Sequence, residues 1–231
     1  PESLKDVTSI WITGGEPLMD NNCYDLIDIL AEHGNESQTD MVITTNGSKV
    51  DLDKLQKFEN LKFFELDLSI DAPNIMFEYM RSAGIFTWEQ MSKLIDDLTY
   101  FKKQNSSWFH MCFNASIQAY NYDTVLEFDS VCRKAGALNN TRMLIFPEHF
   151  RLDVLPYKYR KEEFDKIKDY KVINDPRFKR THSDICKNML QKQASDEIVK
   201  KFKQQTIAQD EYRNMNIKDF HPQLAEFIYE R

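Results

Sequence analysis

Apolar runs and helical stripes alternate along the first two thirds of the chain. Apolar or alternating segments predict strands at residues 7–12, 41–45, 63–70, 108–117 and 140–147. Between them, apolar positions at helical spacing predict helices over 24–32, 51–58, 88–103 and 123–134, with Asp123 as the N-cap of the last. Strands that alternate with helices form parallel sheets through right-handed crossovers. The pattern therefore predicts an α/β fold, either a partial barrel or an open doubly wound sheet.

The pattern changes after residue 149, where the strand signals stop. Charged amphipathic segments predict helices over 160–169, 184–191, 196–205 and 223–229, and Asp175-Pro176 predicts a turn. We therefore expect a partial barrel over residues 1–155 and a helical C-terminal extension over 156–231.

Composition narrows the class of protein. The chain has 231 residues, of which 42% are hydrophobic and 29% are charged, as expected for a globular protein. A net charge of −7 argues against a general nucleic-acid surface. No apolar run approaches the roughly 20 residues of a membrane span, and no secretory signal opens the chain. With unpaired cysteines, these features predict a cytoplasmic protein.

The candidate chemistry lies where the first predicted strand ends. Ile12-Thr-Gly-Gly-Glu-Pro-Leu-Met-Asp20 follows that strand and leads into a helix. Gly14 and Gly15 let a ligand approach the backbone closely, Glu16 supplies a carboxylate, and Pro17 fixes the direction of the exit. The alternative is a plain turn between a strand and a loop.

Three strand ends together resemble the radical SAM superfamily, in its Gly-Gly-Glu-Pro form. They carry Gly14 to Pro17, Thr45-Asn46-Gly47 and Ser69-Ile70-Asp71, in the order found in that family. The resemblance implies that the first turn binds the amino group of S-adenosylmethionine. It implies cofactor-binding roles for Gly14, Gly15, Glu16, Pro17, Thr45, Asn46, Ser69, Asp71, Arg81, Asn114 and Ser116.

These residue types suit an amino-acid ligand. An ammonium group needs hydrogen-bond acceptors, which a carbonyl-lined turn beside a carboxylate supplies. The Arg81 guanidinium could pair with a carboxylate as a fork. Alternatives remain open: Thr45-Asn46-Gly47 is also an ordinary turn, Arg81 could be a surface residue, and Asn114 and Ser116 could satisfy backbone groups.

The cysteines of this sequence do not include the cluster-binding loop of the family. Members of the family hold a [4Fe–4S] cluster with a CxxxCxxC loop, which this sequence lacks. Cys23, Cys112, Cys132 and Cys186 are too far apart for such a loop, and we expect buried structural thiols and no metal ligand in this chain. The resemblance therefore implies a (β/α)6 barrel whose first βα unit and cluster ligands lie upstream of Pro1.

The resemblance implies part of a radical SAM enzyme. With its cluster, such an enzyme cleaves S-adenosylmethionine to a 5′-deoxyadenosyl radical, which abstracts hydrogen from a small-molecule or peptide substrate, unknown here. An electron donor such as flavodoxin or ferredoxin is implied by the family. The helical tail is loosely similar to those of twitch-type members. This chain alone should be inactive because iron ligands are absent, and no catalytic residue is assigned.

Two other functions remain open. One is a cluster-free relative that binds S-adenosylmethionine or a partner without radical chemistry. The other is an α/β binding module in which Gly-Gly-Glu-Pro occurs by accident.

Overall fold

Five parallel strands form one open sheet whose spatial order follows the chain. The computed structural model describes residues 6–19, 21–33, 35–82, 85–172 and 176–229. The strands lie in the order β1-β2-β3-β4-β5. Their bounds are β1 Ser9–Ile12, β2 Asp40–Thr45, β3 Phe63–Ser69, β4 Phe109–Ile117 and β5 Leu138–Met143. The α/β fold with parallel strands that the sequence predicts is confirmed.

Helical segments connect successive strands. The α-helices of this part are α1 Asn22–Glu32, α2 Leu52–Leu55, α3 Ile75–Phe77, α4 Trp88–Gln104 and α5 Val125–Ala135. Short 3-10 turns are η2 Pro17–Met19, η3 Glu36–Gln38 and η4 Gln56–Phe58, and a π-helical turn, η5, covers Glu78–Ser82. Gly34, beside which the first helix was expected to end, lies outside the described residues.

The chain after β5 is helical, as predicted. It contains η6 Glu148–Phe150, η7 Leu152–Val154, α6 Tyr157–Ile167, α7 Pro176–Met189, α8 Asp196–Arg213, α9 Ile217–Phe220 and α10 Pro222–Tyr229. Among the described residues, no helix combines the length and the apolar character that crossing a membrane requires.

The chain divides into two compact units. The first unit comprises Pro1–Ser69, Glu89–Phe113 and Cys132–Leu138. The second unit comprises Ile70–Trp88, Asn114–Val131 and Asn139–Arg231. The domain boundary expected at residue 155 stays a prediction.

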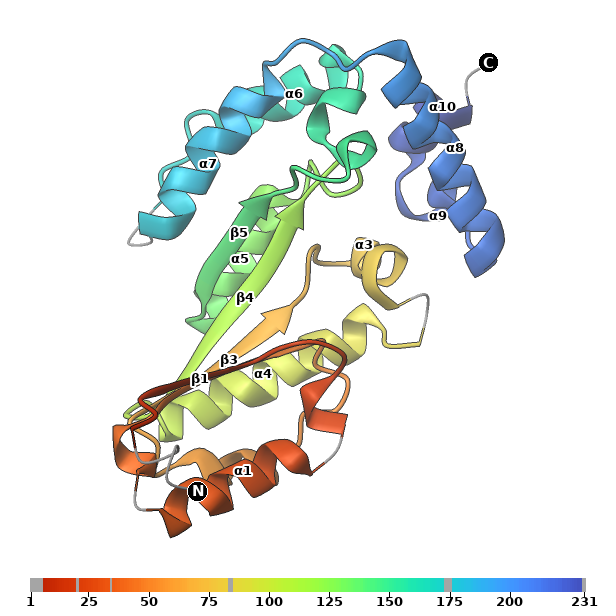
Figure 1. The fold of residues 1–231 in the computed structure, drawn as a ribbon. Helices are drawn as coiled ribbons and strands as arrows, with labels where there is room; N and C mark the ends of the chain where they lie inside the picture. The colour runs from red at the N-terminus through yellow and green to blue at the C-terminus, as the bar shows by residue number, and fades with distance from the viewer. Residues whose placement is uncertain (1–5, 20, 34, 83–84, 173–175, 230–231) are drawn as a thin grey trace. The chain divides into compact units, whose positions relative to one another are not determined.

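Helices cover one face of the strands in the first unit. Phe64 of β3 stacks on Phe58 with ring centroids 4.3 Å apart, and Phe101 of α4 meets Phe109 of β4 edge-on at 5.1 Å. Figure 1 shows α4 lying alongside β3. Met91 and Leu98, two residues of the stripe predicted for this helix, are fully buried. This packing supports the strand ends that carry the candidate site.

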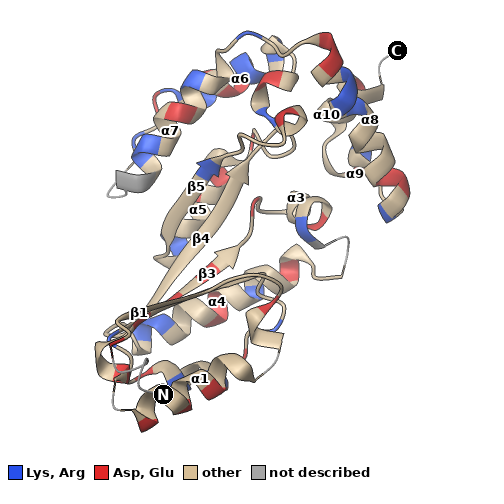
Figure 2. Cartoon of the chain, viewed as in Figure 1, with Lys and Arg blue, Asp and Glu red and all other residues tan. Residues whose placement is uncertain are grey.

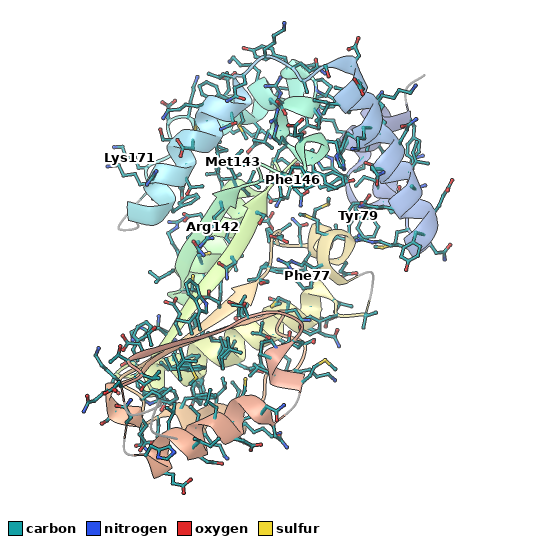
Figure 3. The ribbon with its side chains drawn as sticks, in the orientation of Figure 1. Phe77, Tyr79, Arg142, Met143, Phe146 and Lys171 are labelled. Carbon is teal, nitrogen blue, oxygen red and sulfur yellow. The ribbon has the colours of Figure 1, made fainter. Side chains whose placement is uncertain are left out.

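A buried carboxylate organises the second unit. Asp210 of α8 accepts hydrogen bonds from the Tyr79 hydroxyl at 2.9 Å, the Ile217 N–H at 2.9 Å and the Tyr229 hydroxyl at 3.0 Å. Arg213 also donates to the Tyr79 carbonyl at 2.8 Å. Figure 3 labels Tyr79 beside α3. These bonds join the π-helical turn, α9 and α10 to α8.

Two predicted element boundaries are wrong. β5 ends at Met143 instead of residue 147, because Ile145 and Phe146 are 76% and 81% exposed and do not belong to a buried strand. The helix expected to begin at Asp123 begins at Val125, so Asp123 lies one residue before the N-cap position. Its Oδ2 lies 3.2 Å from Nε2 of His221.

Two tail helices are several residues longer than predicted. α8 ends at Arg213 instead of residue 205. α7 begins at Pro176, eight residues before the expected start at 184. Proline is well suited to a first helical position, because its missing N–H has no intrahelical partner there. Asp175, the other half of the predicted turn, lies outside the described residues.

Candidate functional site

The turn after β1 presents open backbone. Gly14 and Gly15 have φ values of +92° and +55°, which side-chain-bearing residues rarely adopt. A Cβ built on either glycine would meet no atom within 4 Å. The space beside this turn is therefore free to receive a ligand group, and a side chain at either position would project into it.

The Glu16 carboxylate connects this turn to the end of β2 through hydrogen bonds. One carboxylate oxygen, Oε1, accepts from the Thr45 hydroxyl at 2.5 Å, and Oε2 accepts from the Asn46 N–H at 2.8 Å. The Leu18 N–H lies 3.4 Å from Oε1. A carboxylate has about four acceptor positions, so Glu16 retains capacity for a further donor.

The end of β2 is itself a tightly bonded turn. The Thr45 hydroxyl oxygen accepts from the Gly47 N–H at 3.1 Å, and the Asn46 side chain accepts from the Ser48 N–H at 2.8 Å. Thr45 is buried and Asn46 is exposed. The structure thus brings Glu16, Thr45 and Asn46 together, as the resemblance implied, through bonds that the sequence pattern alone did not predict.

Pro17 and Ser69 have less distinct surroundings. Pro17 begins the η2 turn, and Ser69 ends β3; both are half-buried. Since the carboxyl ends of parallel strands share one edge of a sheet, Ser69 belongs to the same edge as the turns after β1 and β2. We call this edge, formed by the ends of β1, β2 and β3, the glycine edge.

Asp71 and Arg81 form an ion pair in the second unit. Arg81 Nε lies 2.6 Å from Asp71 Oδ2, and the Ser116 N–H donates to Asp71 Oδ1 at 2.8 Å. The Asn121 side chain donates to the Asp71 carbonyl at 2.7 Å. Asp71 also has a positive φ of 62°, a strained value for a residue with a side chain. Arg81 is exposed, and its guanidinium pairs with a carboxylate of the chain.

The polar residues of β4 bond to the chain itself. The Asn114 side-chain oxygen accepts from Asn140 Nδ2 at 2.5 Å, while Ser116 contributes its backbone N–H to Asp71. Asn140 and Asn121 are members of this cluster that the resemblance did not assign. The only sequence signal for them was their place beside strand ends.

The four cysteines belong to different elements of the chain. Cys23, Cys112 and Cys132 are buried and Cys186 is half-buried, and in the described structure all four are reduced thiols. Burial raises the pKa of the Cys186 thiol, which disfavours the thiolate that binds metal. Among the described residues, one trio of possible metal ligands occurs, Glu65, Asp67 and Cys112, whose ligand atoms lie within 4.8 Å of one another.

Comparisons with known proteins point in the same direction as the motifs. The sequence model of the Radical SAM superfamily matches residues 2–101. No curated protein sequence matches the chain.

Solved structures share a distant likeness. SuiB of Streptococcus suis bound to S-adenosylmethionine is 17% identical, with a TM-score of 0.45 over 70% of this chain and 34% of that one. The same protein bound to its precursor peptide SuiA is 16% identical, with a TM-score of 0.45 over 70% and 35%. An archaeal TYW1 is 19% identical, with a TM-score of 0.44 over 76% and 55%. The chain spans about a third to a half of the length of these relatives.

Proposed function

We propose that this chain is part of a radical SAM enzyme and that its glycine edge binds the amino-acid end of S-adenosylmethionine. The match to the superfamily over residues 2–101 supports this, because that segment contains β1, β2, β3 and their terminal turns. The observation that carries the proposal is the Glu16 carboxylate, held by two bonds beside the open backbone of Gly14 and Gly15.

The residues of the glycine edge fit this cofactor. An α-ammonium group donates three hydrogen bonds and carries a positive charge, so it needs several acceptors and a nearby anion. Glu16 supplies the anion, and the glycine turn supplies backbone that a donor can approach without meeting a side chain. Thr45 and Asn46 orient Glu16 before the ligand arrives, which lowers the entropy lost on binding.

The cofactor role of the second-unit residues stays a prediction. Arg81 pairs with Asp71 through Nε, and the guanidinium has further N–H donors that a ligand carboxylate could use beside Asp71. Asn114 and Ser116 also form hydrogen bonds within the chain, Asn114 through its side-chain oxygen and Ser116 through its backbone N–H. We retain all four as proposed cofactor-binding residues.

The cysteines of this chain do not fit a [4Fe–4S] cluster. Such a cluster needs several thiolates around one site, whereas the four cysteines lie singly on α1, β4, α5 and α7. The trio of Glu65, Asp67 and Cys112 offers a single sulfur. The helical tail, proposed as twitch-like, contains only Cys186 and fits no auxiliary cluster. When bound, S-adenosylmethionine supplies a sulfonium whose carbon–sulfur bonds can be cleaved.

Hydrogen abstraction from a substrate is therefore proposed only with cluster ligands from outside this sequence. An electron donor such as flavodoxin or ferredoxin and a cytoplasmic location belong to the same proposal.

A second candidate is a cluster-free protein that binds S-adenosylmethionine, which the scattered cysteines favour. The coding sequence upstream of Pro1 discriminates between the two, because the enzyme requires a CxxxCxxC loop there and the cluster-free protein does not.

Binding of S-adenosylmethionine to the full chain tests the glycine edge. Calorimetric titration should show binding that Glu16→Gln weakens roughly tenfold, because a charge-assisted hydrogen bond to the ammonium is lost. Glu32→Gln removes an exposed charge from the end of α1 and should leave the dissociation constant unchanged.

A second ligand separates lost recognition from local damage. 5′-Methylthioadenosine lacks the amino-acid group, so its affinity should be the same for the wild-type chain and for Glu16→Gln. Equal losses for both ligands would mean that the substitution disturbs the turn generally. Unchanged binding of S-adenosylmethionine, or none by the folded wild-type chain, would contradict the proposed site.

A further inference from the structure

A cavity in the second unit lies where β5 ends. It has a volume of about 540 Å³ and is lined by the end of β5, by Arg151 and by one face of α7. Ligand pockets of proteins commonly have volumes of about 300–1,000 Å³. No residue assigned to the glycine edge lines this cavity. The inference drawn from it stands independently of the function proposed above.

The charge of the cavity comes mainly from Arg142. Its Nε lies 3.4 Å from the Asn140 side-chain oxygen, and no carboxylate in the described part of the chain pairs with it. Figure 3 labels Arg142 near the end of β5, on the side toward α7. An unpaired guanidinium in a concave site presents several donors to an incoming anion.

The other charged groups of the lining are already compensated. Arg151 donates from Nε and Nη2 to the Asp153 carboxylate at 3.2 and 2.5 Å. This bonding raises the pKa of Arg151 and fixes its orientation. Asp184 lies 3.4 Å from the ammonium of Lys187. Figure 2 colours the charged residues of α7, and among those described Asp184 is the single acidic one. The uncompensated charge at the cavity is therefore positive.

The remaining lining combines an apolar side with a polar side. Met143, the last residue of β5, and Ile145, two residues beyond it, contribute apolar surface, and Ile145 is 76% exposed. Thr181, Asp184 and Asn188 lie on the facing side, and their spacing places them on one face of α7. A ligand here would meet a cation, apolar side chains and hydrogen-bonding groups together.

From these contacts we infer that the cavity binds a small organic anion, in which a carboxylate or phosphate group is attached to an apolar body. The anionic group pairs with Arg142, with Arg151 held in place beside it, and the apolar body packs on Met143 and Ile145. A free inorganic anion would lack the second set of contacts. A neutral molecule would leave the positive charge of Arg142 without an anionic partner.

Titration of the full chain with matched aromatic probes tests this inference. Phenyl phosphate and benzoate carry the two anionic groups on one apolar ring, and benzyl alcohol is the neutral equivalent. We expect at least one of the two anions to bind roughly tenfold more tightly than benzyl alcohol, as a charge-assisted hydrogen bond provides. The tighter anion identifies the ligand as a phosphate ester or as a carboxylate.

Two substitutions of Arg142 locate the binding. Arg142→Gln should remove the preference for the anion, whereas Arg142→Lys should keep part of it because the charge remains without the planar fork. Lys200→Gln removes one exposed positive charge from α8 and should change nothing. If Arg142→Gln does not fold, Arg142→Lys still provides the measurement.

Three results would overturn the inference. They are equal affinity for benzyl alcohol and both anions, an anion preference that survives Arg142→Gln, and an equal loss on Lys200→Gln. The last would indicate general attraction of anions to surface charge.

Discussion

Gly47 shows how one absent side chain allows a helix to pack on a strand end. Gly47 lies two residues after the end of β2 and has a φ of +83°. A Cβ at this position would lie 3.0 Å from Leu94 Cδ2 and 3.1 Å from Met91 Cε. Both partners belong to α4. A side chain at this position would strain the backbone and also push on the helix that covers the sheet.

We expect Gly47→Ala to lower the free energy of unfolding by about 2 kcal/mol, since backbone strain and overpacking add. Gly136→Ala is a matched control, because it has a φ of +63° but its nearest atom, Lys102 Nζ, lies 3.7 Å away. The control should lose about 1 kcal/mol, from the backbone alone. Urea unfolding measures both, and equal losses would rule out the crowding against α4.

Tyr24 makes the first unit sensitive to alkaline pH. Its ring is buried against Phe58, with centroids 5.7 Å apart, and its hydroxyl has no hydrogen-bond partner among the described residues. Burial, with the negative charge of Asp51 as the next cause, raises the pKa of Tyr24 from 10.0 to about 12. The folded protein therefore binds this proton more tightly than the unfolded chain does.

The stability from this group is complete below pH 10 and declines as pH rises from 10 toward 12. When the pH rises above 12, the wild-type protein should lose up to about 3 kcal/mol of its free energy of unfolding through Tyr24, and the Tyr24→Phe variant should not show this loss. At pH 8 it should be neutral or stabilising, since no hydrogen bond is lost. Urea unfolding at several pH values, compared between wild type and variant, measures the difference. Parallel curves across the alkaline range would contradict the raised pKa.

At the scale of elements, Asp210 is the junction of the helical tail. It bonds α8 to the π-helical turn, α9 and α10, and every one of its partners is a donor. An asparagine at this position keeps one acceptor oxygen but loses the charge and the second acceptor.

We expect Asp210→Asn to lower the free energy of unfolding by about 2–3 kcal/mol, because buried donors lose their partners. Tyr79→Phe removes only one of these bonds and should cost about 1 kcal/mol. Asp219→Asn, an exposed substitution on α9, is the control and should have no effect. Thermal unfolding measures the differences. Equal melting temperatures for Asp210→Asn and Asp219→Asn would contradict the role of Asp210.

Elements with a clear period were predictable, and their ends were less so. The stripe through Met91 and Leu98 predicted α4 because packing on one face imposes a helical spacing. The apolar run through Ile145 and Phe146 led to a prediction of β5 that is too long. An apolar residue can be exposed or buried, and its identity alone does not distinguish the two. The π-helical turn that carries Arg81 leaves no periodic signal.

At the scale of the whole molecule, the parallel sheet and the glycine edge followed from local patterns, and the pairing of charges did not. Glu16 was predicted at the site because its motif is contiguous. That it would be held by Thr45 and Asn46 depends on contacts between distant segments. The same holds for Arg81, whose partner Asp71 could be identified only in three dimensions. Side-chain partners across elements have no signature in a single sequence.

The order of the strands also has a consequence for how the chain folds. Ser9 pairs with Asp40, and Asp40 pairs with Phe63, so each of these strands lies beside the one made just before it. During synthesis, the strand that pairs with each new strand has therefore already left the ribosome, and pairing does not depend on a segment that is synthesised later. Each pairing closes one crossover between neighbouring strands. Because the loop-closure entropy must be overcome before a parallel pair gains its contacts, this sheet forms more slowly than a series of hairpins would, and its growing edge is open to aggregation until the next strand adds.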